Sequence, residues 1–444
     1  MKRIVIAGAG SHCGKTTVTC GLLASLRNKG VSVAAYKTGP DYIDPQYLRE
    51  AGKCEAYNLD TWLMSPERVK ELFVRTSRTK DIAIIEGAMG LFDGGTDSTA
   101  AIAKLLGAPV VLVVDARSAG ESAAAVALGF REYDHDVYLA GVILNNAGSD
   151  YHVKIIADAL AEKGIKFLGA LRRDDGLAVP ERHLGLALEH RGSKLERVRL
   201  AVEGSVDFEE IMRIAGEAGT LNADVHELTP IVRGVRIGVA RDEAFSFYYP
   251  ESLAVLEELG AEIAEFSPLK DAELPEAEGY IFGGGFPEMF AASLAGNAPM
   301  LESVRRNRRP VLAECGGMMY LCRSLSDLEG RAWPMAGVLP FEARMTGRAV
   351  LGYMDAEALR TNILCEAGER LRVHEFHYSR VEPEYREGTC AFRLTRRNTG
   401  ASRFGGYADG GVLASYLHVN FWGNIEAAQK FVSSCVDIKH SSIT

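Results

Sequence analysis

The stretch IVIAGAGSHCGKTTVT, residues 4–19, decides the fold of the first part of the chain. An apolar run leads into a glycine-rich loop that ends in Gly-Lys-Thr-Thr, and a helix-like stretch follows. A loop in this setting presents backbone N–H groups and a helix N-terminus to an anion, and its lysine neutralises the anion's charge. We therefore predict a phosphate-binding loop. Its predicted nucleotide-binding residues are Gly10, Gly14, Lys15, Thr16 and Thr17.

The loop departs from the strict pattern at one position. The pattern has glycine six positions before Lys15, and here Ala9 stands there between Gly8 and Gly10. The flanking glycines still allow a tight turn, so an ordinary strand–helix turn is the less favoured alternative. Thr16 follows the lysine, where a hydroxyl can ligate Mg²⁺. We expect a phosphate-bearing ligand and Mg²⁺ at this loop.

The chain beyond this loop alternates short apolar runs with helical stretches. Runs such as SVAAYK, DIAIIEG, PVVLVVDA and GVILNN are almost wholly apolar, as strands buried on both faces are. This alternation predicts an α/β fold with a doubly wound parallel sheet over residues 1–190. A charged helical segment at 191–232 reads as a connector. A second α/β domain follows over 233–444, and its late strands without helices between them indicate a mixed sheet.

Composition excludes several classes of function. The net charge is −9 and no long basic run occurs, so we expect no nucleic-acid partner. No apolar stretch reaches the roughly 18 residues that a membrane span needs. The start of the chain is too quickly polar for a secretory signal, and the eight cysteines form no C-x-x-C pair. These features predict a cytoplasmic protein without a membrane partner.

Polar residues follow several predicted strands, where ligands gather in an open α/β sheet. Asp41, Asp44, Glu86 and Asp93 are such residues, and turn or cap chemistry is a balanced alternative for Asp44 and Asp93. Glu86 ends the apolar run DIAII, where an acid is costly to bury unless it is paired or coordinated. Asn145, at the end of GVILNN, could present its amide to a purine base.

A second reactive motif is PVLAECGGMMYL, residues 310–321. Cys315 stands between a predicted strand and a predicted helix, so it is placed like a nucleophile at an elbow rather than like a core thiol. We expect the helix N-terminus to lower the pKa of this thiol. The loop FGGGFPE, residues 282–288, could add N–H donors for an oxyanion. His418 is the preferred base, and His374 and His377 are the alternatives.

The order and spacing of several segments match one family. These segments are GKTTVT, KTGPDYIDPQY, EGAMGLFDG, GVILN, VPERHLGL, GGGFPE, AECGGMMYL, GVLPF, HEFHYS and SYLHVNF. The chain resembles, nearly end to end, the cobyrinic acid a,c-diamide synthases of cobalamin synthesis. The resemblance implies an ATP-dependent amidoligase domain similar to dethiobiotin synthetase, joined to a domain similar to class I glutamine amidotransferases.

The resemblance also implies a reaction. Cys315 would release ammonia from L-glutamine through a thioester, with His418 as base. ATP would phosphorylate the a and c acetate carboxylates of cobyrinic acid, a tetrapyrrole polycarboxylate, and ammonia would displace phosphate. The residues implied for substrate handling are Asp41, Tyr42, Ile43, Asp44 and Asp93. Those implied for the metal are Thr16, Asp41 and Glu86.

Several points stay open at this level. Relatives that amidate nickel sirohydrochlorin or sirohaem share these motifs, so the tetrapyrrole and its metal are not determined. The order of the two amidations and the choice between monomer and homodimer are open too. Many glutamine amidotransferases carry Glu two residues after the base, and here Asn420 stands there, so the group that orients His418 is unnamed. A partitioning-type regulatory ATPase is a remote alternative, because its loop has a second lysine where this chain has Gly10.

Overall fold

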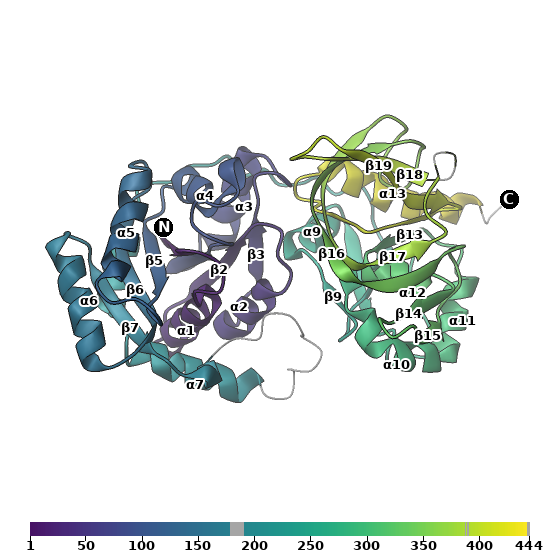
Figure 1. Cartoon of the computed structure of the whole chain (residues 1–444). Coiled ribbons are helices and arrows are strands. Elements are labelled where there is room, and N and C mark those ends of the chain that lie inside the picture. Colours follow the sequence, from purple (N-terminus) through teal and green to yellow (C-terminus); the bar gives the residue numbers. More distant parts are fainter. Residues whose placement is uncertain (178–190, 387, 389, 442–444) are drawn as a thin grey trace. The chain divides into compact units, whose positions relative to one another are not determined.

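The computed structural model describes residues 1–177, 191–386, 388 and 390–441. The chain forms two compact units, each with its own sheet (Figure 1). The first unit comprises Met1–Thr61 and Ser65–His226, and the second comprises Trp62–Met64 and Glu227–Thr444. In the described part of the chain, no helix combines the length and apolar character that crossing a bilayer requires.

The first unit is built on a sheet of seven parallel strands. In chain order they are β1 (Lys2–Gly8), β2 (Val33–Thr38), β3 (Ala56–Leu59), β4 (Ile82–Glu86), β5 (Val110–Asp115), β6 (Leu139–Ala147) and β7 (Phe167–Arg172). Their order in the sheet is β3-β2-β4-β1-β5-β6-β7, so the chain winds both ways from β1. The strands are buried along most of their length, as the apolar runs required. The predicted doubly wound parallel sheet is thus confirmed.

Helices connect these strands. They are α1 (Lys15–Asn28), α2 (Asp44–Gly52), α3 (Pro66–Ser77), α4 (Thr99–Leu106), α5 (Ser122–Tyr133), α6 (Asp150–Glu162), α7 (Arg191–Glu203) and α8 (Phe208–Gly216), with short 3-10 turns at Gly95–Asp97 and Asp175–Leu177. Serines cap three of them: the side chains of Ser65, Ser98 and Ser149 accept backbone N–H groups at the starts of α3, α4 and α6. Such caps satisfy amide donors that the helix itself leaves unpaired.

Helices α7 and α8 belong to the first unit. Val198 and Val202 of α7 are buried, and α7 lies so close to α1 that a Cβ on Gly21 would approach Val202 Cγ2 to 2.2 Å. Ser25 of α1 also donates a hydrogen bond to the Arg199 carbonyl, at 3.2 Å. The segment 191–232, which we read as a connector, therefore contributes two packed helices before the units divide at residue 226.

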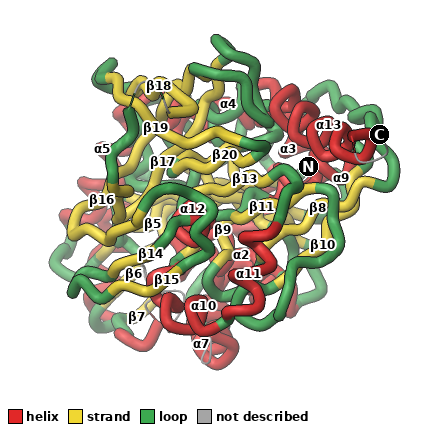
Figure 2. Tube along the Cα trace, turned by 90° about the vertical axis from the view of Figure 1, so that its right-hand side faces the viewer, coloured by secondary structure: helices red, strands yellow, loops and turns green. Residues whose placement is uncertain are grey.

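The second unit holds a mixed sheet of twelve strands. Its strands are β8 (Val235–Ala240), β10 (Ala261–Phe266), β11 (Gly279–Phe282), β13 (Val311–Glu314), β14 (Ser324–Ser326), β15 (Ala332–Pro334), β16 (Glu342–Ala358), β17 (Arg370–Glu382), β18 (Cys390–Arg396), β19 (Ser402–Asp409), β20 (Val412–Ser415) and β21 (Leu417–Val419). The neighbours β10, β8, β11, β13 and β20 are parallel, and β20, β19, β18, β16, β17 and β21 follow as antiparallel pairs. Figure 2 shows the sheet running from β18 and β19 through β13 and β11 to β8 and β10. The predicted mixed sheet is present.

The remaining elements of this unit surround that sheet. A small two-stranded sheet pairs β9 (Phe245–Phe247) with β12 (Gly284–Gly285). The helices are α9 (Pro250–Glu258), the 3-10 turn η5 (Pro287–Phe290), α10 (Ala291–Gly296), α11 (Ala298–Arg306), α12 (Gly316–Leu321) and α13 (Ile425–Ser441).

Three residues that precede α3 also pack in the second unit. The Trp62 ring lies 4.4 Å from the Arg397 guanidinium carbon, and Leu63 and Met64 are buried. A Cβ on Gly423 would lie 1.8 Å from the Leu63 carbonyl oxygen, so only glycine lets the two backbones meet.

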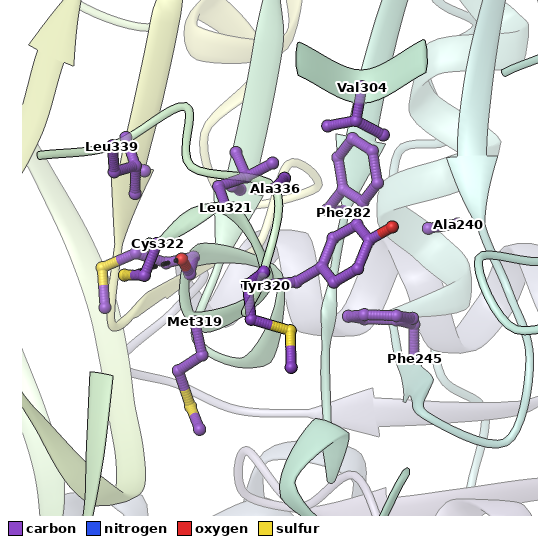
Figure 3. Packing of buried hydrophobic residues seen from close by; sticks show 14 of the residues in the cluster. Ala240, Phe245, Phe282, Val304, Met319, Tyr320, Leu321, Cys322, Ala336 and Leu339 are labelled. Atoms are coloured by element: carbon purple, nitrogen blue, oxygen red, sulfur yellow. Dashed lines mark hydrogen bonds between the residues drawn. The ribbon is translucent and has the colours of Figure 1, made fainter. Parts of the chain in front are cut away.

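An aromatic group centred on Tyr320 of α12 anchors the core of the second unit (Figure 3). Its ring centroid lies 5.4 Å from that of Phe245 and 5.8 Å from that of Phe282. The Tyr320 side chain is fully buried, and its hydroxyl has no hydrogen-bond partner among the described residues. Because α12 begins directly after Cys315, this packing also fixes the backbone of the elbow.

We predict that Tyr320→Ala lowers the stability of the second unit by about 3–5 kcal/mol, as removal of a buried aromatic ring does. Tyr320→Phe should leave the unfolding temperature unchanged or raise it, because it removes a buried hydroxyl without a partner. Differential scanning calorimetry of the full chain measures both. A loss from Tyr320→Phe as large as that from Tyr320→Ala would contradict this account.

Candidate active sites

Hydrogen bonds from Lys15 and Asn145 hold the phosphate loop of the first unit in its conformation. Gly14 has a φ of 94°, and a Cβ there would lie 2.0 Å from Asn145 Nδ2. Lys15 Nζ donates to the Gly10 carbonyl at 2.9 Å, and Asn145 Nδ2 donates to the Cys13 carbonyl at 3.0 Å. The loop thus has the strand–turn–helix setting that the sequence predicted, with Lys15 folded back onto it. Asn145 Nδ2 is engaged in holding the loop, and a role in reading a purine stays a prediction.

A buried lysine joins the ends of two strands beside this loop. Lys37 Nζ donates to Glu86 Oε1 at 2.8 Å and to Asp44 Oδ2 at 2.6 Å, and Thr16 Oγ1 donates to Glu86 Oε1 at 2.7 Å. Lys37 and Glu86 are register partners in β2 and β4, which sets their side chains at the same edge of the sheet. The sequence analysis missed Lys37. Its signal was a charged residue closing the apolar run SVAAYK at a strand end.

The charges in this cluster shift one another's protonation. Burial raises the pKa of Glu86, and Lys37 only partly offsets this. Burial and the charge of Asp44 raise the pKa of Asp41. Burial alone would lower the pKa of Lys37, but Glu86 and Asp44 outweigh it and raise that pKa. Lys37 therefore stays cationic among more numerous carboxylates, and the cluster favours a further cation.

The residues at this edge fit Mg²⁺ in part. Glu86 Oε2 is buried and has no hydrogen-bond partner among the described residues. The other carboxylate oxygen, Oε1, accepts a hydrogen bond from the Thr16 hydroxyl. Across the described ranges, no group of three or more His, Cys, Asp or Glu side chains is arranged to enclose a metal. Mg²⁺ characteristically takes one or two carboxylates and completes its shell with phosphate oxygens and water. Thr16 and Glu86 suit such an open site.

The predicted substrate residues divide between a turn and a loop. Asp41 Oδ1 accepts the backbone N–H groups of Ile43 at 2.7 Å and Asp44 at 3.1 Å, so it caps the turn that begins α2. Tyr42 is buried within that turn. Asp93 lies exposed on a separate loop, where its Oδ2 accepts the Gly90 N–H at 2.8 Å. The turn chemistry weighed for these acids is present, and their contact with substrate stays a prediction.

Cys315 of the second unit lies at a strained elbow between β13 and α12. Its φ is 47°, a left-handed value that is rare for a residue with a side chain. The start of α12 leaves no room for a side chain at position 317, because a Cβ on Gly317 would lie 2.0 Å from the Phe282 carbonyl oxygen. Cys315 Sγ donates to the Phe376 carbonyl at 3.4 Å. The strand–turn–helix context that the sequence predicted for this cysteine is present.

The helix lowers the pKa of this thiol as expected, but burial outweighs that effect. We expected the N-terminus of α12 to lower the pKa of Cys315. Burial instead raises that pKa well above its ordinary value, and the charges of Glu288 and Glu314 add to the rise against a backbone hydrogen bond from Gly316. The helix has only six residues, and its effect is smaller than the cost of burying a thiolate. In the free protein the thiol is therefore protonated.

Glu314 is a candidate for the orienting group that the sequence left unnamed. Its Oε2 lies 3.4 Å from His418 Nδ1, and its Oε1 accepts the Val419 N–H at 3.0 Å. His418 lies on β21 and is fully buried. Asn420, in the position of the expected acid, instead donates from Nδ2 to Glu251 Oε1 at 2.8 Å. Strand β13 thus presents a carboxylate to the histidine from the residue before the nucleophile.

The two alternative histidines are less suited to act as base. His377 uses both ring nitrogens, one on Glu375 Oε1 at 3.0 Å and the other on the Ser379 carbonyl at 2.7 Å. Burial and the neighbouring His418 lower the pKa of His374 to about 3. A base with so low a pKa removes a thiol proton poorly. The hydrogen bonds of His377 and the low pKa of His374 therefore leave His418 as the preferred candidate.

Comparison with known proteins bears on both units. Residues 4–186 match a family model described as the CobQ/CobB/MinD/ParA nucleotide binding domain, and residues 236–425 match one described as the CobB/CobQ-like glutamine amidotransferase domain. The cobyrinate a,c-diamide synthase of Dehalococcoides mccartyi (strain CBDB1) is 41% identical over 453 residues, which cover 97% of each chain. That of Methanothermobacter thermautotrophicus is 41% identical over 438 residues, which cover 94% of this chain and 96% of the relative.

We predict that Gly14→Ala weakens ATP binding by at least about tenfold, because the added Cβ meets Asn145 and the left-handed backbone disfavours it. Isothermal titration calorimetry of the full chain measures this. The matched control is Gly129→Ala in α5, where a Cβ meets nothing within 4 Å. Equal ATP affinity of Gly14→Ala and Gly129→Ala would show that the loop does not need its present conformation.

Proposed function

Since the chain belongs to the cobyrinate a,c-diamide synthase family, we propose how its two units divide that family's reaction. The protein carries out glutamine-dependent, ATP-driven amidation in cobalamin biosynthesis, with cobyrinate as substrate and its a and c side chains as the sites of amide formation. The observation that carries this conclusion is the identity of about 40% with the synthases over nearly the whole of both chains. The phosphate loop and the Cys315 elbow give each unit a separate part.

The second unit supplies ammonia. Cys315 Sγ attacks the side-chain amide carbon of glutamine, and His418 takes the thiol proton and returns it to the departing ammonia. Water then hydrolyses the thioester and releases glutamate. Glu314 beside His418 Nδ1 holds the ring and stabilises its protonated form, the part that a buried carboxylate plays in a triad. A Cβ on Gly316 would lie 3.2 Å from Gly285 N, so the 282–288 loop borders the position where the oxyanion forms.

The first unit activates the acid. A substrate carboxylate oxygen attacks the γ-phosphorus of ATP, which gives an acyl phosphate and ADP. Ammonia then attacks the acyl carbon, and phosphate leaves as the amide forms. Lys15 and the loop amides hold the nucleotide phosphates, with Gly10, Gly14 and Thr17 shaping the loop. Lys37 balances the carboxylates at this edge of the sheet.

Mg²⁺ would be held by Thr16 and by the unpaired oxygen of Glu86, and when bound it neutralises charge on the phosphates. Asp41 caps its turn in the free protein and is a further candidate for the metal sphere. The turn with Tyr42, Ile43 and Asp44, and the exposed Asp93, are our candidates for contact with the tetrapyrrole. A reducing cytoplasm is the proposed location, because all eight cysteines are free thiols.

The first test separates the two halves of the reaction. Cys315→Ala should abolish amidation with glutamine and leave amidation with ammonium salts intact, since only nitrogen release uses the thiol. Lys15→Ala should abolish both. Mass spectrometry of cobyrinate products, with ATP, Mg²⁺ and either nitrogen source, reports the outcome. Equal loss of both activities in Cys315→Ala would contradict the assigned role of the elbow.

The second test concerns Glu314 as a positioning residue. Glu314→Gln keeps an oxygen that can accept from Val419 but removes the charge beside His418. We expect kcat for glutamine hydrolysis to fall by about 10²–10⁴-fold, the range that a positioned base contributes, with ammonia-dependent amidation unchanged. The pH profile of kcat should also shift, because His418⁺ loses its counter-charge. An unchanged pH profile would assign Glu314 a purely structural part.

A further inference from the structure

A small cavity opens beside the elbow cysteine. It has a volume of about 20 Å³, and Cys315, Glu288, Phe376, Met319 and Met345 are among the residues that line it. Glu288 stands in η5, at the end of the loop that borders the elbow. Glu288 and the nucleophile thus line the same small space.

Glu288 is a carboxylate without a counter-charge. It makes no ion pair with any residue between 191 and 386 or in the other described ranges, and it accepts a hydrogen bond from its own backbone N–H. The lining residues include neither lysine nor arginine, and His377 in that lining spends both ring nitrogens on Glu375 and Ser379. Burial raises the pKa of Glu288 to about 7, which reflects the cost of an uncompensated charge.

We propose that Glu288 binds the α-ammonium group of L-glutamine and so selects an amino acid, rather than any primary amide, for the Cys315 elbow. This inference rests on the proposed glutaminase function of the second unit. The α-ammonium is the only cationic group of glutamine. Glu288 is the carboxylate in the cavity lining that lacks a cationic partner. A charge-assisted hydrogen bond in a partly buried site gives both affinity and orientation.

The same contact would activate the nucleophile. The negative charge of Glu288 is the second cause, after burial, of the raised pKa of Cys315. A bound ammonium offsets that charge, so the thiol becomes easier to ionise when glutamine arrives. An empty site keeps the thiol protonated and unreactive.

Binding requires the cavity to widen. A volume of about 20 Å³ holds roughly one water molecule, which is less than glutamine needs. Two of its walls are Met319 and Met345, and methionine side chains adapt their shape readily. The pairing of β16 with β17 is irregular between Met345 and Val350, so this wall borders a break in the ladder.

The test compares two substrates in one variant. Glutaramate, 4-carbamoylbutanoate, has the amide and carboxylate of glutamine but no α-amino group. For Glu288→Gln we expect kcat/KM with glutamine to fall by about 10–100-fold. We expect kcat/KM with glutaramate not to fall, because the variant also removes the charge that raises the pKa of Cys315. Glu276→Gln, at an exposed acid of the same unit, is the matched control and should change neither.

The outcomes separate this inference from the proposed function. An equal loss with both substrates in Glu288→Gln would overturn the inference, because the ammonium would then not be what the carboxylate recognises. Unchanged glutamine kinetics would overturn it as well. Glutamine hydrolysis that survives Cys315→Ala would overturn the proposed function itself.

Discussion

The buried contact between Lys37 and Glu86 is the interaction on which the arrangement of the first unit depends. It joins β2 to β4, extends to α2 through Asp44, and reaches the phosphate loop through Thr16. Each of these groups is costly to bury alone, and removal of one partner from a buried pair costs about 3–5 kcal/mol. The strand ends, the loop and the start of α2 therefore hold one another in place, and the cluster lies where phosphate binds.

The second unit uses the same end of its parallel strands for different chemistry. Strand β13 ends at Glu314 and Cys315 follows it, so one turn provides both the nucleophile and the acid that faces the histidine. Packing of α12 through Tyr320 keeps that turn strained. A rigid core beneath a strained nucleophile is a common way to maintain a conformation that the backbone alone would not choose.

The sequence predicted what depends on local pattern. Apolar runs between helical stretches were enough to predict the parallel sheet, and the Gly-rich turns around Lys15 and Cys315 were enough to predict the strand–turn–helix setting of both residues. The side-chain contacts at those sites were harder to predict, because the tertiary fold brings together residues that are distant in sequence. Glu314 and Val419, for example, lie 105 positions apart and share a hydrogen bond. Lys37 was missed because acids, not bases, were sought at the strand ends. The pKa of Cys315 was misjudged because a local effect of the helix was weighed without burial. The charged pattern of 191–232 concealed Val198 and Val202, which pack α7 against α1.

The residues Trp62–Met64 have a consequence for how such a protein can be encoded. The chain passes from one unit to the other three times, at residues 61, 64 and 226, and not once as in a simple tandem fusion. A gene divided after codon 226 would leave the second half without Trp62–Met64, so Arg397 would lose its contact with the Trp62 ring and Gly423 would lose the backbone that packs against it. Ancestral halves encoded by separate genes would have needed another residue at position 423 or another cover for it. Packing of the second unit thus depends on a segment that lies within the sequence of the first.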